Sequence, residues 1–268
     1  MNAESNIAGI ADASKPNAGR MYDYFLGGNH NFEVDRKAAE EVIKVAPFLP
    51  KLSKLIRWFL GEAIRRLCDQ GYTKFLDFAS GLPTADHIHQ IAPAGTKVIY
   101  SDIDPVTVAY ANELIADNPD VRYVHCDAGK PEELLHSDVV QELFGDDRKI
   151  AIGLNGIAWF LPEPALEHSL KTLYEWAAPG SKLFISDGDN PNTPEEARQL
   201  QEFYNRLGQP VHFKPLERFY EISKPWQVEE PGFKVLEEWV DLPPDVSDGL
   251  KSFWGGGGAI YGGFLKKE

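Results

Sequence analysis

The sequence predicts an α/β domain in which helices cover both faces of a doubly wound, mostly parallel sheet. Two patterns lead to this prediction. Between residues 74 and 186, five short apolar runs alternate with helical stretches, as in repeated strand–helix–strand units. Near the C-terminus, two further apolar runs follow each other without a full helical crossover, and strands joined in this way are usually antiparallel. We therefore expect a seven-stranded sheet with one antiparallel strand near the C-terminus.

The N-terminal quarter of the chain has a different pattern. Residues 1–15 are small and polar, and we expect a flexible arm there. Apolar residues then return every three or four positions over Ala38–Val45 and Leu52–Cys68, which predicts helices. We expect residues 16–72 to form a helical segment packed on a core of residues 73–268, within one structural domain.

The elements of the core follow from the same patterns. The expected strands are Lys74–Phe78, Lys97–Ser101, Val121–His125, Ile150–Leu154, Lys182–Ser186, Lys234–Leu242 and Ala259–Lys266. The expected helices are Thr84–Ile91, Pro105–Asp117, Pro131–Leu143, Glu163–Ala177 and Pro194–Arg206. Asp104 and Thr193 each precede a proline, so each places a capping oxygen directly before a residue suited to the first helical turn. Both residues support the helix that follows them.

Composition narrows the classes of partner. The chain has 27 Lys and Arg against 41 Asp and Glu, a net charge of −14 at pH 7. A surface of this charge repels phosphate backbones and anionic lipids, so we expect neither a nucleic-acid nor a membrane partner. Cys68 and Cys126 lack the spacing of a metal site or a disulfide framework, and no apolar run approaches the ~20 residues of a membrane span. We expect no metal, and a cytoplasmic protein with reduced cysteines.

The segment after the first expected strand is the most informative part of the sequence. The strand ends at Asp77, and the small residues Ala79, Ser80 and Gly81 come next. Small residues let a ligand approach the backbone closely, and open sheets of this class bind ligands at the carboxyl ends of their strands. A plain turn between a strand and a helix has the same composition, so this segment alone leaves both interpretations open.

Two further acids follow the next two expected strands. Asp102 comes 21 residues after Gly81 (102 − 81), and a carboxylate about 20 residues beyond such a turn holds ribose hydroxyls in nucleotide-binding folds. Asp104 is a second candidate, although its position suits the N-cap of the next helix better. Asp127 follows the third strand, where a carboxylate can accept a hydrogen bond from the exocyclic amine of adenine. Three acids at successive strand ends predict a nucleoside-containing ligand.

These motifs, in this order, resemble the class I methyltransferase fold, which is Rossmann-like. Together with the segment Asn17–Phe32, the GLPT sequence at Gly81–Thr84 and the segment Asn155–Pro162, they more narrowly resemble the S-adenosyl methyltransferase family common in actinobacteria. The resemblance extends from about residue 20 to the C-terminus. Two residues depart from it: Ala79 stands where a glycine is usual, and Trp159 stands where the family typically has a histidine.

The resemblance implies that S-adenosylmethionine is the cofactor. The residues implied to line its methionine end are Asp77, Ala79, Gly81 and Leu82. Asp102 is implied to hold the ribose, and Asp127 and Ala128 the adenine. Ile103 and Asn155 are also implied to bind the cofactor. The residues implied to close over the site from the N-terminal segment are Arg20, Tyr22, Gly28 and Asn29. We expect residues 20–32 to be a lid that orders with the cofactor, the alternative being a permanently docked helix.

The predicted function is an S-adenosylmethionine-dependent methyltransferase acting on a small-molecule acceptor. No catalytic base stands out, and displacement at a sulfonium needs one only if the acceptor loses a proton in the transition state. Two alternatives stay open. A nicotinamide-dependent oxidoreductase shares the turn and the distal acid, although the chain has no G-x-G-x-x-G motif. A non-catalytic, cofactor-binding regulatory protein is compatible with Trp159. Neither the acceptor nor the oligomeric state follows from the sequence.

Overall fold

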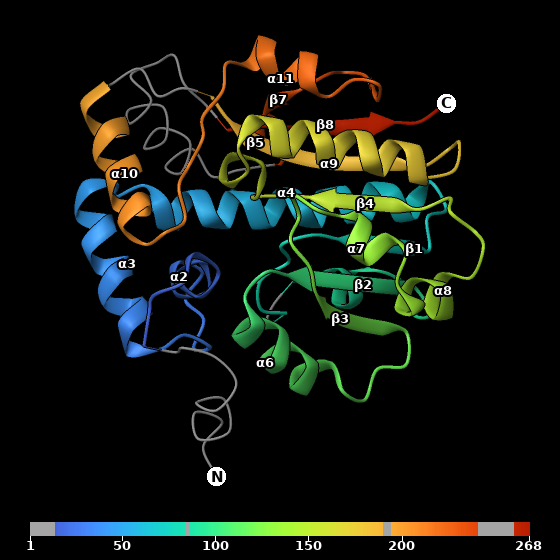
Figure 1. Cartoon of the computed structure of the whole chain (residues 1–268), viewed down its shortest axis with the longest axis horizontal. Helices are drawn as coiled ribbons and strands as arrows, with labels where there is room; N and C mark the ends of the chain where they lie inside the picture. The colour runs from blue at the N-terminus through green and yellow to red at the C-terminus, as the bar shows by residue number, and fades with distance from the viewer. Residues whose placement is uncertain (1–13, 84–85, 190–193, 241–259) are drawn as a thin grey trace.

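The computed structural model describes residues 14–83, 86–189, 194–240 and 260–268, and these form one eight-stranded sheet (Figure 1). Its strands are β1 Lys74–Asp77, β2 Lys97–Asp102, β3 Val121–His125, β4 Ala151–Leu154, β5 Lys182–Gly188, β6 Gln227–Val228, β7 Lys234–Val235 and β8 Ile260–Lys266. Their order across the sheet is β3-β2-β1-β4-β5-β8-β6, and β7 also pairs with β8. Strands β1 to β5 pair in parallel, whereas β8 runs antiparallel to its neighbours. The expected mostly parallel sheet with one reversed strand is confirmed.

The C-terminal part of the sheet corrects the expected count of seven strands. The strand expected over Lys234–Leu242 ends at Val235, where the chain turns into the short 3₁₀ helix η2 (Leu236–Glu238), and the two-residue strand β6 was not expected. Leu236 and Trp239 are both buried, and Trp239 Nε1 donates a hydrogen bond to the Gly262 carbonyl at 2.9 Å. A strand would send these two side chains to opposite faces, whereas a 3₁₀ turn stacks them on one side.

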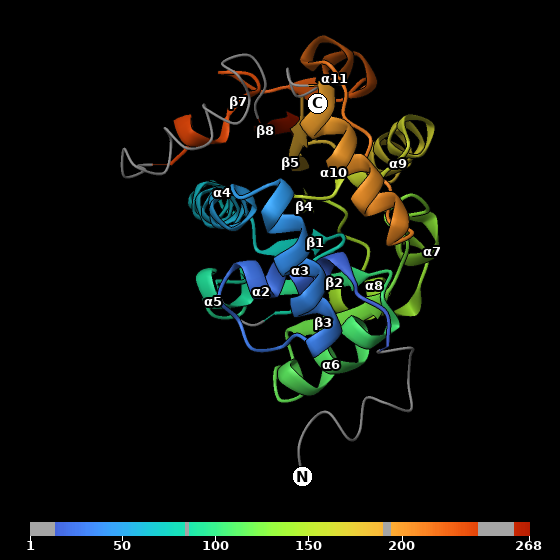
Figure 2. The same cartoon turned by 90° about the vertical axis from the view of Figure 1, so that its left-hand side faces the viewer.

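Helices cover both faces of the sheet, and a third group lies beyond the carboxyl ends of the parallel strands. The helices are α2 Ala18–Phe25, α3 Glu33–Val45, α4 Leu49–Asp69, α5 Ile88–Ile91, α6 Pro105–Ile115, α7 Glu132–Leu135, α8 Asp138–Phe144, α9 Glu163–Trp176, α10 Pro194–Arg206 and α11 Leu216–Ile222, with the 3₁₀ helix η1 at Ala158–Phe160. Figure 2 shows α4 and α5 on one face and α7, α8 and α9 on the other. Helices α2, α3 and α10 lie beyond the strand ends (Figure 1).

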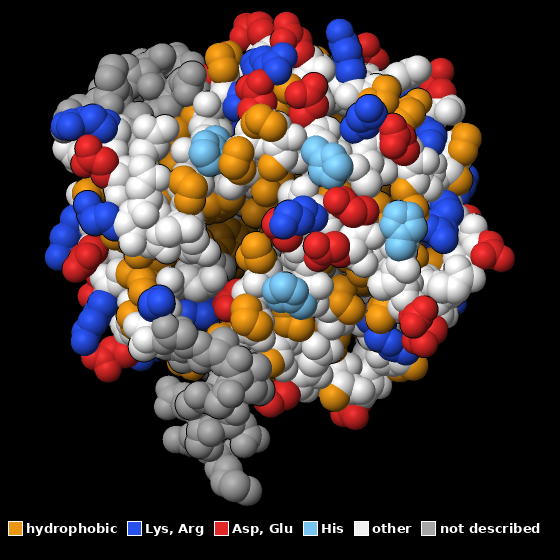
Figure 3. Space-filling view, in the orientation of Figure 1, with side chains coloured by type: hydrophobic (Ala, Val, Ile, Leu, Met, Phe, Trp, Pro, Cys, Tyr) orange, Lys and Arg blue, Asp and Glu red, His pale blue; other side chains and the backbone are white. Residues whose placement is uncertain are grey.

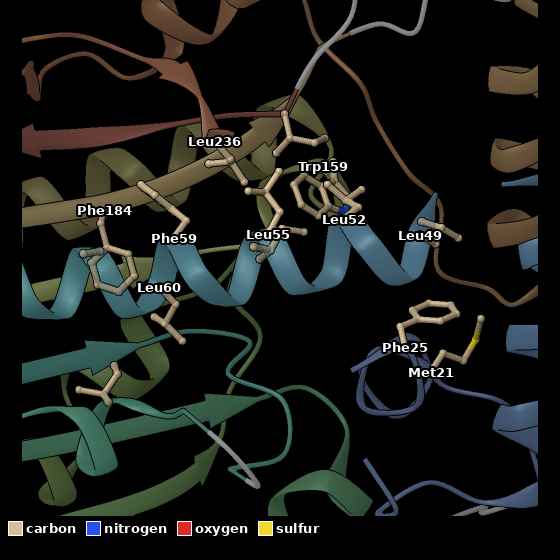
Figure 4. Close-up of a cluster of buried hydrophobic side chains, with 14 of the residues drawn as sticks. Met21, Phe25, Leu49, Leu52, Leu55, Phe59, Leu60, Trp159, Phe184 and Leu236 are labelled. Atoms are coloured by element: carbon tan, nitrogen blue, oxygen red, sulfur yellow. The ribbon is translucent and has the colours of Figure 1, made fainter. Parts of the chain in front are cut away.

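The strands divide their side chains between two hydrophobic layers. On β1, Phe75 joins the layer beneath α4, and the next residue, Leu76, joins the layer beneath α9. This alternation follows from the two-residue period of a strand, and burial on both faces explains the successive apolar residues within the inner strands. Figure 4 shows the α4 layer, in which Phe59 of the helix lies near Phe184 of β5, and Leu55 lies one turn further along the helix, near Trp159.

Two expected helices are shorter than predicted. Within the described residues, the helix expected over Thr84–Ile91 is present only as α5, which His87 precedes in an extended conformation. The helix expected over Pro131–Leu143 is divided into α7 and α8, because Ser137 is extended and takes the N-cap position of α8. Residues 84–85, most of the expected arm at residues 1–15, and the end of the expected strand Lys234–Leu242 lie outside the described residues.

The N-terminal segment contains the two predicted helices, α3 and α4, which begin several residues earlier than expected, and a third helix that was not predicted. This third helix, α2, begins after Asn17, whose side-chain oxygen accepts hydrogen bonds from the backbone of Gly19 and Arg20. Met21 and Phe25, one turn apart, are buried in the α4 layer. No helix in the described part of the chain combines the length and apolar character needed to cross a membrane.

Candidate active site

The loop after β1 has a backbone conformation that favours small residues. Ala79 and Gly81 have φ angles of +51° and +65°, in the left-handed region that glycine adopts most easily. Alanine at position 79 thus adopts a backbone conformation that glycine would adopt with less strain. The loop is tied to its neighbours by Ser80 N–H, which donates to the Ser101 carbonyl at 2.9 Å, and by the Tyr123 hydroxyl, which donates to the Gly81 carbonyl at 2.7 Å.

Asp77 places a carboxyl group at the end of β1, and only 5% of the residue is exposed. Its Oδ1 lies directly over β4, where a Cβ at Gly153 would clash with it. Burial raises the pKa of Asp77 to about 7, and the charge of Asp102 raises it further, while Ser80 and the Arg57 guanidinium oppose the increase. The side chain therefore titrates near neutral pH.

Asp102 connects the ends of β1 and β2. Its Oδ2 accepts a hydrogen bond from Gly81 N–H at 3.1 Å, and its Oδ1 accepts one from Asp104 N–H at 2.9 Å. Burial raises the pKa of Asp102 to about 6, against the lowering effect of these backbone hydrogen bonds. A carboxylate offers about four acceptor positions, so two backbone bonds leave capacity for ligand hydroxyls. Asp104 serves as the N-cap of α6, as its position suggested.

The end of β3 carries the third predicted acid. Asp127 Oδ1 accepts a hydrogen bond from Gly129 N–H at 2.8 Å, which shapes the turn that follows the strand. Ala128 is buried in this turn, and both residues line the same cavity as Asp77 and Asp102. The carboxyl ends of β1, β2 and β3 thus bring the three acids to one edge of the sheet.

A cavity of about 640 Å³ extends from these strand ends toward α2, α4 and α10, within the roughly 300–1,000 Å³ range of ligand pockets. Figure 3 shows a hollow with a hydrophobic interior on this face of the molecule. Of the thirteen residues predicted to bind the cofactor, those that line the cavity are Tyr22, Asp77, Ala79, Gly81, Asp102, Ile103, Asp127, Ala128 and Asn155. Those that do not line it are Arg20, Gly28, Asn29 and Leu82.

Arg20 makes structural contacts. Its Nε donates to Asp35 Oδ2 at 2.8 Å, its Nη1 to Asp104 Oδ2 at 2.7 Å, and its Nη2 to the Lys15 carbonyl at 2.7 Å. Arg20 is 3% exposed and Asp35 is completely buried. The arginine therefore ties α2 to α3 and to the N-terminus of α6, and holds the N-terminal segment on the sheet.

The other three residues outside the lining also have local roles. A Cβ at Gly28 would clash with Asp23 Oδ1, because the loop after α2 folds over this carboxylate. Asp23 Oδ2 accepts hydrogen bonds from His30 N–H at 2.9 Å and from the Asn31 side chain at 2.8 Å. Asn29 in the same loop is exposed. Leu82 is buried, and its carbonyl accepts a hydrogen bond from His87 Nε2 at 2.6 Å.

Comparison with known proteins identifies the family. A sequence model described as S-adenosyl methyltransferase matches residues 4–259. The chain belongs to the S-adenosyl methyltransferase family. It is similar to a Thermobifida fusca protein assigned as a methyltransferase, with 28% identity, coverage of 96% of this chain and 97% of that one, and a TM-score of 0.84. A DUF574-family protein from Streptomyces avermitilis has 26% identity, coverage of 96% and 99%, and a TM-score of 0.84.

A more distant structure supports the class I fold. Phosphoethanolamine N-methyltransferase 2 from Haemonchus contortus, solved with S-adenosyl-L-methionine, has 14% identity to this chain, coverage of 93% of this chain and 56% of that one, and a TM-score of 0.51. No curated protein sequence matches the chain. The protein is thus an S-adenosylmethionine-dependent methyltransferase, and neither alternative function receives support from these comparisons.

In this methyltransferase, one face of α4 supplies cavity residues that sequence analysis missed. They are Leu49, Leu52, Ser53, Ile56, Arg57 and Leu60, spaced at the three- and four-residue intervals of a helix face. Asn155, which was predicted, joins this helix to the sheet: its Nδ2 donates to the Ile56 carbonyl at 3.1 Å, and its Oδ1 accepts from the Ser186 hydroxyl at 2.8 Å. The periodicity predicted the helix but gave no sign of which face meets the cavity.

The end of the cavity away from the acids is apolar. Its aromatic members are Phe25, Phe48, Trp159, Phe160, Tyr204 and Phe213. Figure 4 shows Phe25 of α2 near the beginning of α4, and Trp159 next to Leu52. Phe160 and Tyr204 pack edge to face with ring centroids 5.5 Å apart, which joins η1 to α10. The cavity therefore has a polar part at the strand ends and an aromatic part between the helices.

Proposed function

We propose that this methyltransferase binds S-adenosylmethionine at the strand ends and methylates a small acceptor with an apolar or aromatic body held in the aromatic part of the cavity. The observation that carries the proposal is the division of one cavity into an acidic part and an aromatic part. The net charge of −14 supports a small molecule over a nucleic acid as the acceptor. The two free cysteines support a cytoplasmic location.

The residues at the strand ends fit the proposed cofactor. Asp102 has acceptor capacity for ribose hydroxyls, and Asp127 lies where an adenine amine would find an acceptor. Ile103, which is 53% exposed despite its apolar side chain, offers a flat contact for the base. When bound, S-adenosylmethionine supplies an activated methyl group on its sulfonium.

The chain's own contribution to the reaction is alignment and exclusion of water. Among the described lining residues, the two tyrosines, Tyr22 and Tyr204, are the candidates for a proton acceptor outside the strand ends. Burial raises the pKa of both hydroxyls, so neither is ionised near neutral pH and neither is suited to accept a proton. We therefore propose that the acceptor atom reacts through its own lone pair. The protein walls supply orientation and a dry environment.

We also propose that residues 16–72 act as the cover of the cofactor site, with residues 73–268 as the core. Helix α4 supports this division. One of its faces lines the cavity, and its buried apolar side chains pack in the hydrophobic layer on the sheet. Helix α2 adds Tyr22 and Phe25 to the lining. The segment thus encloses the ligand without contributing a strand.

The test combines binding with turnover. Calorimetry with S-adenosylmethionine, S-adenosylhomocysteine and NADH should show binding of the first two alone. Release of S-adenosylhomocysteine is then followed across acceptors of equal size, comparing neutral aromatic amines, which react through a free lone pair, with phenols and with charged aromatic compounds. We expect turnover with the neutral aromatic amines and not with the phenols, which would have to lose a proton. Binding without turnover on any acceptor, or a preference for charged acceptors, would contradict the proposal.

A pair of tryptophan variants locates the acceptor. Trp159→Ala should raise the KM for the acceptor at least about tenfold, since removing a buried aromatic contact costs roughly 1.5–3 kcal/mol, while leaving the affinity for S-adenosylhomocysteine unchanged. Trp58 lies on α4 but is 38% exposed and does not line the cavity, so Trp58→Ala is the matched control. Equal effects of both substitutions would remove Trp159 from the acceptor site.

A further inference from the structure

Arg57 is a buried cation that forms no salt bridge within the part of the chain that the structure describes. It lies on the cavity face of α4 and is 8% exposed. Its Nε and Nη1 are buried without a hydrogen-bond partner among the described residues. Its guanidinium packs on Tyr22, whose ring centroid lies 5.5 Å from the guanidinium carbon and whose hydroxyl also interacts with it. Burying a guanidinium without its hydrogen bonds is unfavourable, so such a group points to a ligand that completes them.

The surroundings of Arg57 indicate what that ligand carries. Asp77 is close enough for the Arg57 charge to act on its carboxyl group, yet no nitrogen of Arg57 lies within 4.0 Å of a carboxylate in the described chain. The other ionisable groups affected by this charge are His87, Tyr100 and Tyr22, and burial favours the uncharged form of each. One unpaired cation and one buried carboxyl group therefore face the same part of the cavity.

This pair of charges matches the two ends of an α-amino acid. We propose that Arg57 binds the α-carboxylate of the cofactor's methionine moiety, with Asp77 on the side of its α-ammonium group; the inference rests on the proposed cofactor site. A guanidinium forms two parallel hydrogen bonds with a carboxylate, which would satisfy the two nitrogens that lack partners. Arg57 is a binding residue in this proposal and has no role in the transfer itself.

An acceptor carboxylate is the competing occupant. Arg57 lies in the region of Asp77, at the acidic strand ends. Most of the aromatic residues that would surround the acceptor come instead from α2, η1 and α10. The arginine is therefore at the cofactor end of the cavity. Two ligands separate the alternatives: S-adenosylhomocysteine has the amino-acid moiety, and 5′-methylthioadenosine has the same nucleoside thioether without it.

The experiment measures the affinity of both ligands for three variants by calorimetry. Arg57→Met should weaken S-adenosylhomocysteine about 10- to 100-fold, as expected for losing hydrogen bonds to a charged group, and should change 5′-methylthioadenosine less than about twofold. Arg57→Lys keeps the charge but not the paired geometry, so its loss should be smaller. Arg65→Met is the matched control, because Arg65 lies on the same helix and is largely exposed; both affinities should remain at the wild-type value.

The two ligands also make the result decisive. Unchanged binding of 5′-methylthioadenosine shows that the variant is folded and that the nucleoside site is intact. An equal loss for both ligands, or no loss for S-adenosylhomocysteine, would overturn the assignment of Arg57 and leave the proposed function standing. Failure of the wild-type protein to bind either ligand would instead refute the proposed cofactor site.

Discussion

Asp77→Asn tests whether the buried carboxyl group at the end of β1 costs the protein stability. The substitution keeps the shape of the side chain and removes its ionisation. In the folded protein the pKa of Asp77 is raised to about 7 from an ordinary value of 3.8, mainly by burial. Each pKa unit is equivalent to about 1.4 kcal/mol, so the ionised carboxylate lowers the free energy of unfolding by about 4 kcal/mol above pH 7.

The sign of the pH dependence follows from the raised pKa. Below pH 3.8 the group is protonated in both the folded and the unfolded chain, and its contribution to stability is fully present. Between 3.8 and about 7 the unfolded chain ionises first, so the wild-type protein loses stability as the pH rises. Asparagine does not titrate, and the variant lacks this loss. The stability of the variant relative to wild type should therefore increase by about 3 kcal/mol from pH 5 to pH 8.

Urea unfolding of both proteins at pH 5, 6, 7 and 8 measures this difference directly. Asp102, whose pKa is also raised, titrates in both proteins and largely cancels in the comparison. A difference in unfolding free energy that is constant across this range would refute the reasoning, because only the titration of Asp77 is predicted to make it vary. The same variant should bind S-adenosylmethionine more weakly than wild type at every pH. Residues at functional sites often lower the stability of the folded protein in this way while serving its function.

Three further substitutions test the roles assigned to other residues of the site and of the N-terminal segment. Asp102→Ala should weaken S-adenosylmethionine about 10- to 100-fold by calorimetry with an unchanged circular dichroism spectrum, and unchanged affinity would place the ribose elsewhere. Gly81→Val should cost about 1–2 kcal/mol in urea unfolding, because φ is +65°, but more in cofactor binding, because its Cβ meets no protein atom and enters the cavity region. Arg20→Met should lower the free energy of unfolding by about 3–5 kcal/mol, since it leaves the buried Asp35 unpaired; a loss below about 1 kcal/mol would contradict this structural role.

The sheet and its acidic edge were predictable because both depend on local signals. A parallel strand buried on both faces has to be a short apolar run, and each of the five runs between residues 74 and 186 contains a strand. Parallel strands bring their carboxyl ends to one edge, so Asp77, Asp102 and Asp127 had to be neighbours once the strands were correct. The prediction of a strand over Lys234–Leu242 was wrong beyond Val235, because an apolar run does not reveal whether its side chains point to one side of the chain or to both.

Arg57 and α2 were missed for a different reason. An arginine on an amphipathic helix is usually exposed, and its burial here depends on the cavity that α4 covers. Helix α2 is only eight residues long and buries Arg20 and Asp23 along with its apolar residues, so its buried face does not coincide with its apolar face. The burial of Arg20 is favourable because the arginine pairs with carboxylates, and one of these, Asp104, lies 84 residues away in the chain. Contacts of that separation have no signature in the pattern of either segment.

The N-terminal motif and the cofactor site are connected through these same contacts. Asp104 caps α6 and accepts from Arg20, while its own N–H donates to Asp102, which in turn accepts from Gly81 N–H. The hydrogen bonds therefore run without interruption from α2, through the end of β2, to the loop after β1. A motif residue that does not touch the cavity can in this way control the geometry of residues that do. Arg20 is accordingly a positioning residue for the proposed ribose site, and its substitution should weaken cofactor binding only as far as it displaces Asp102.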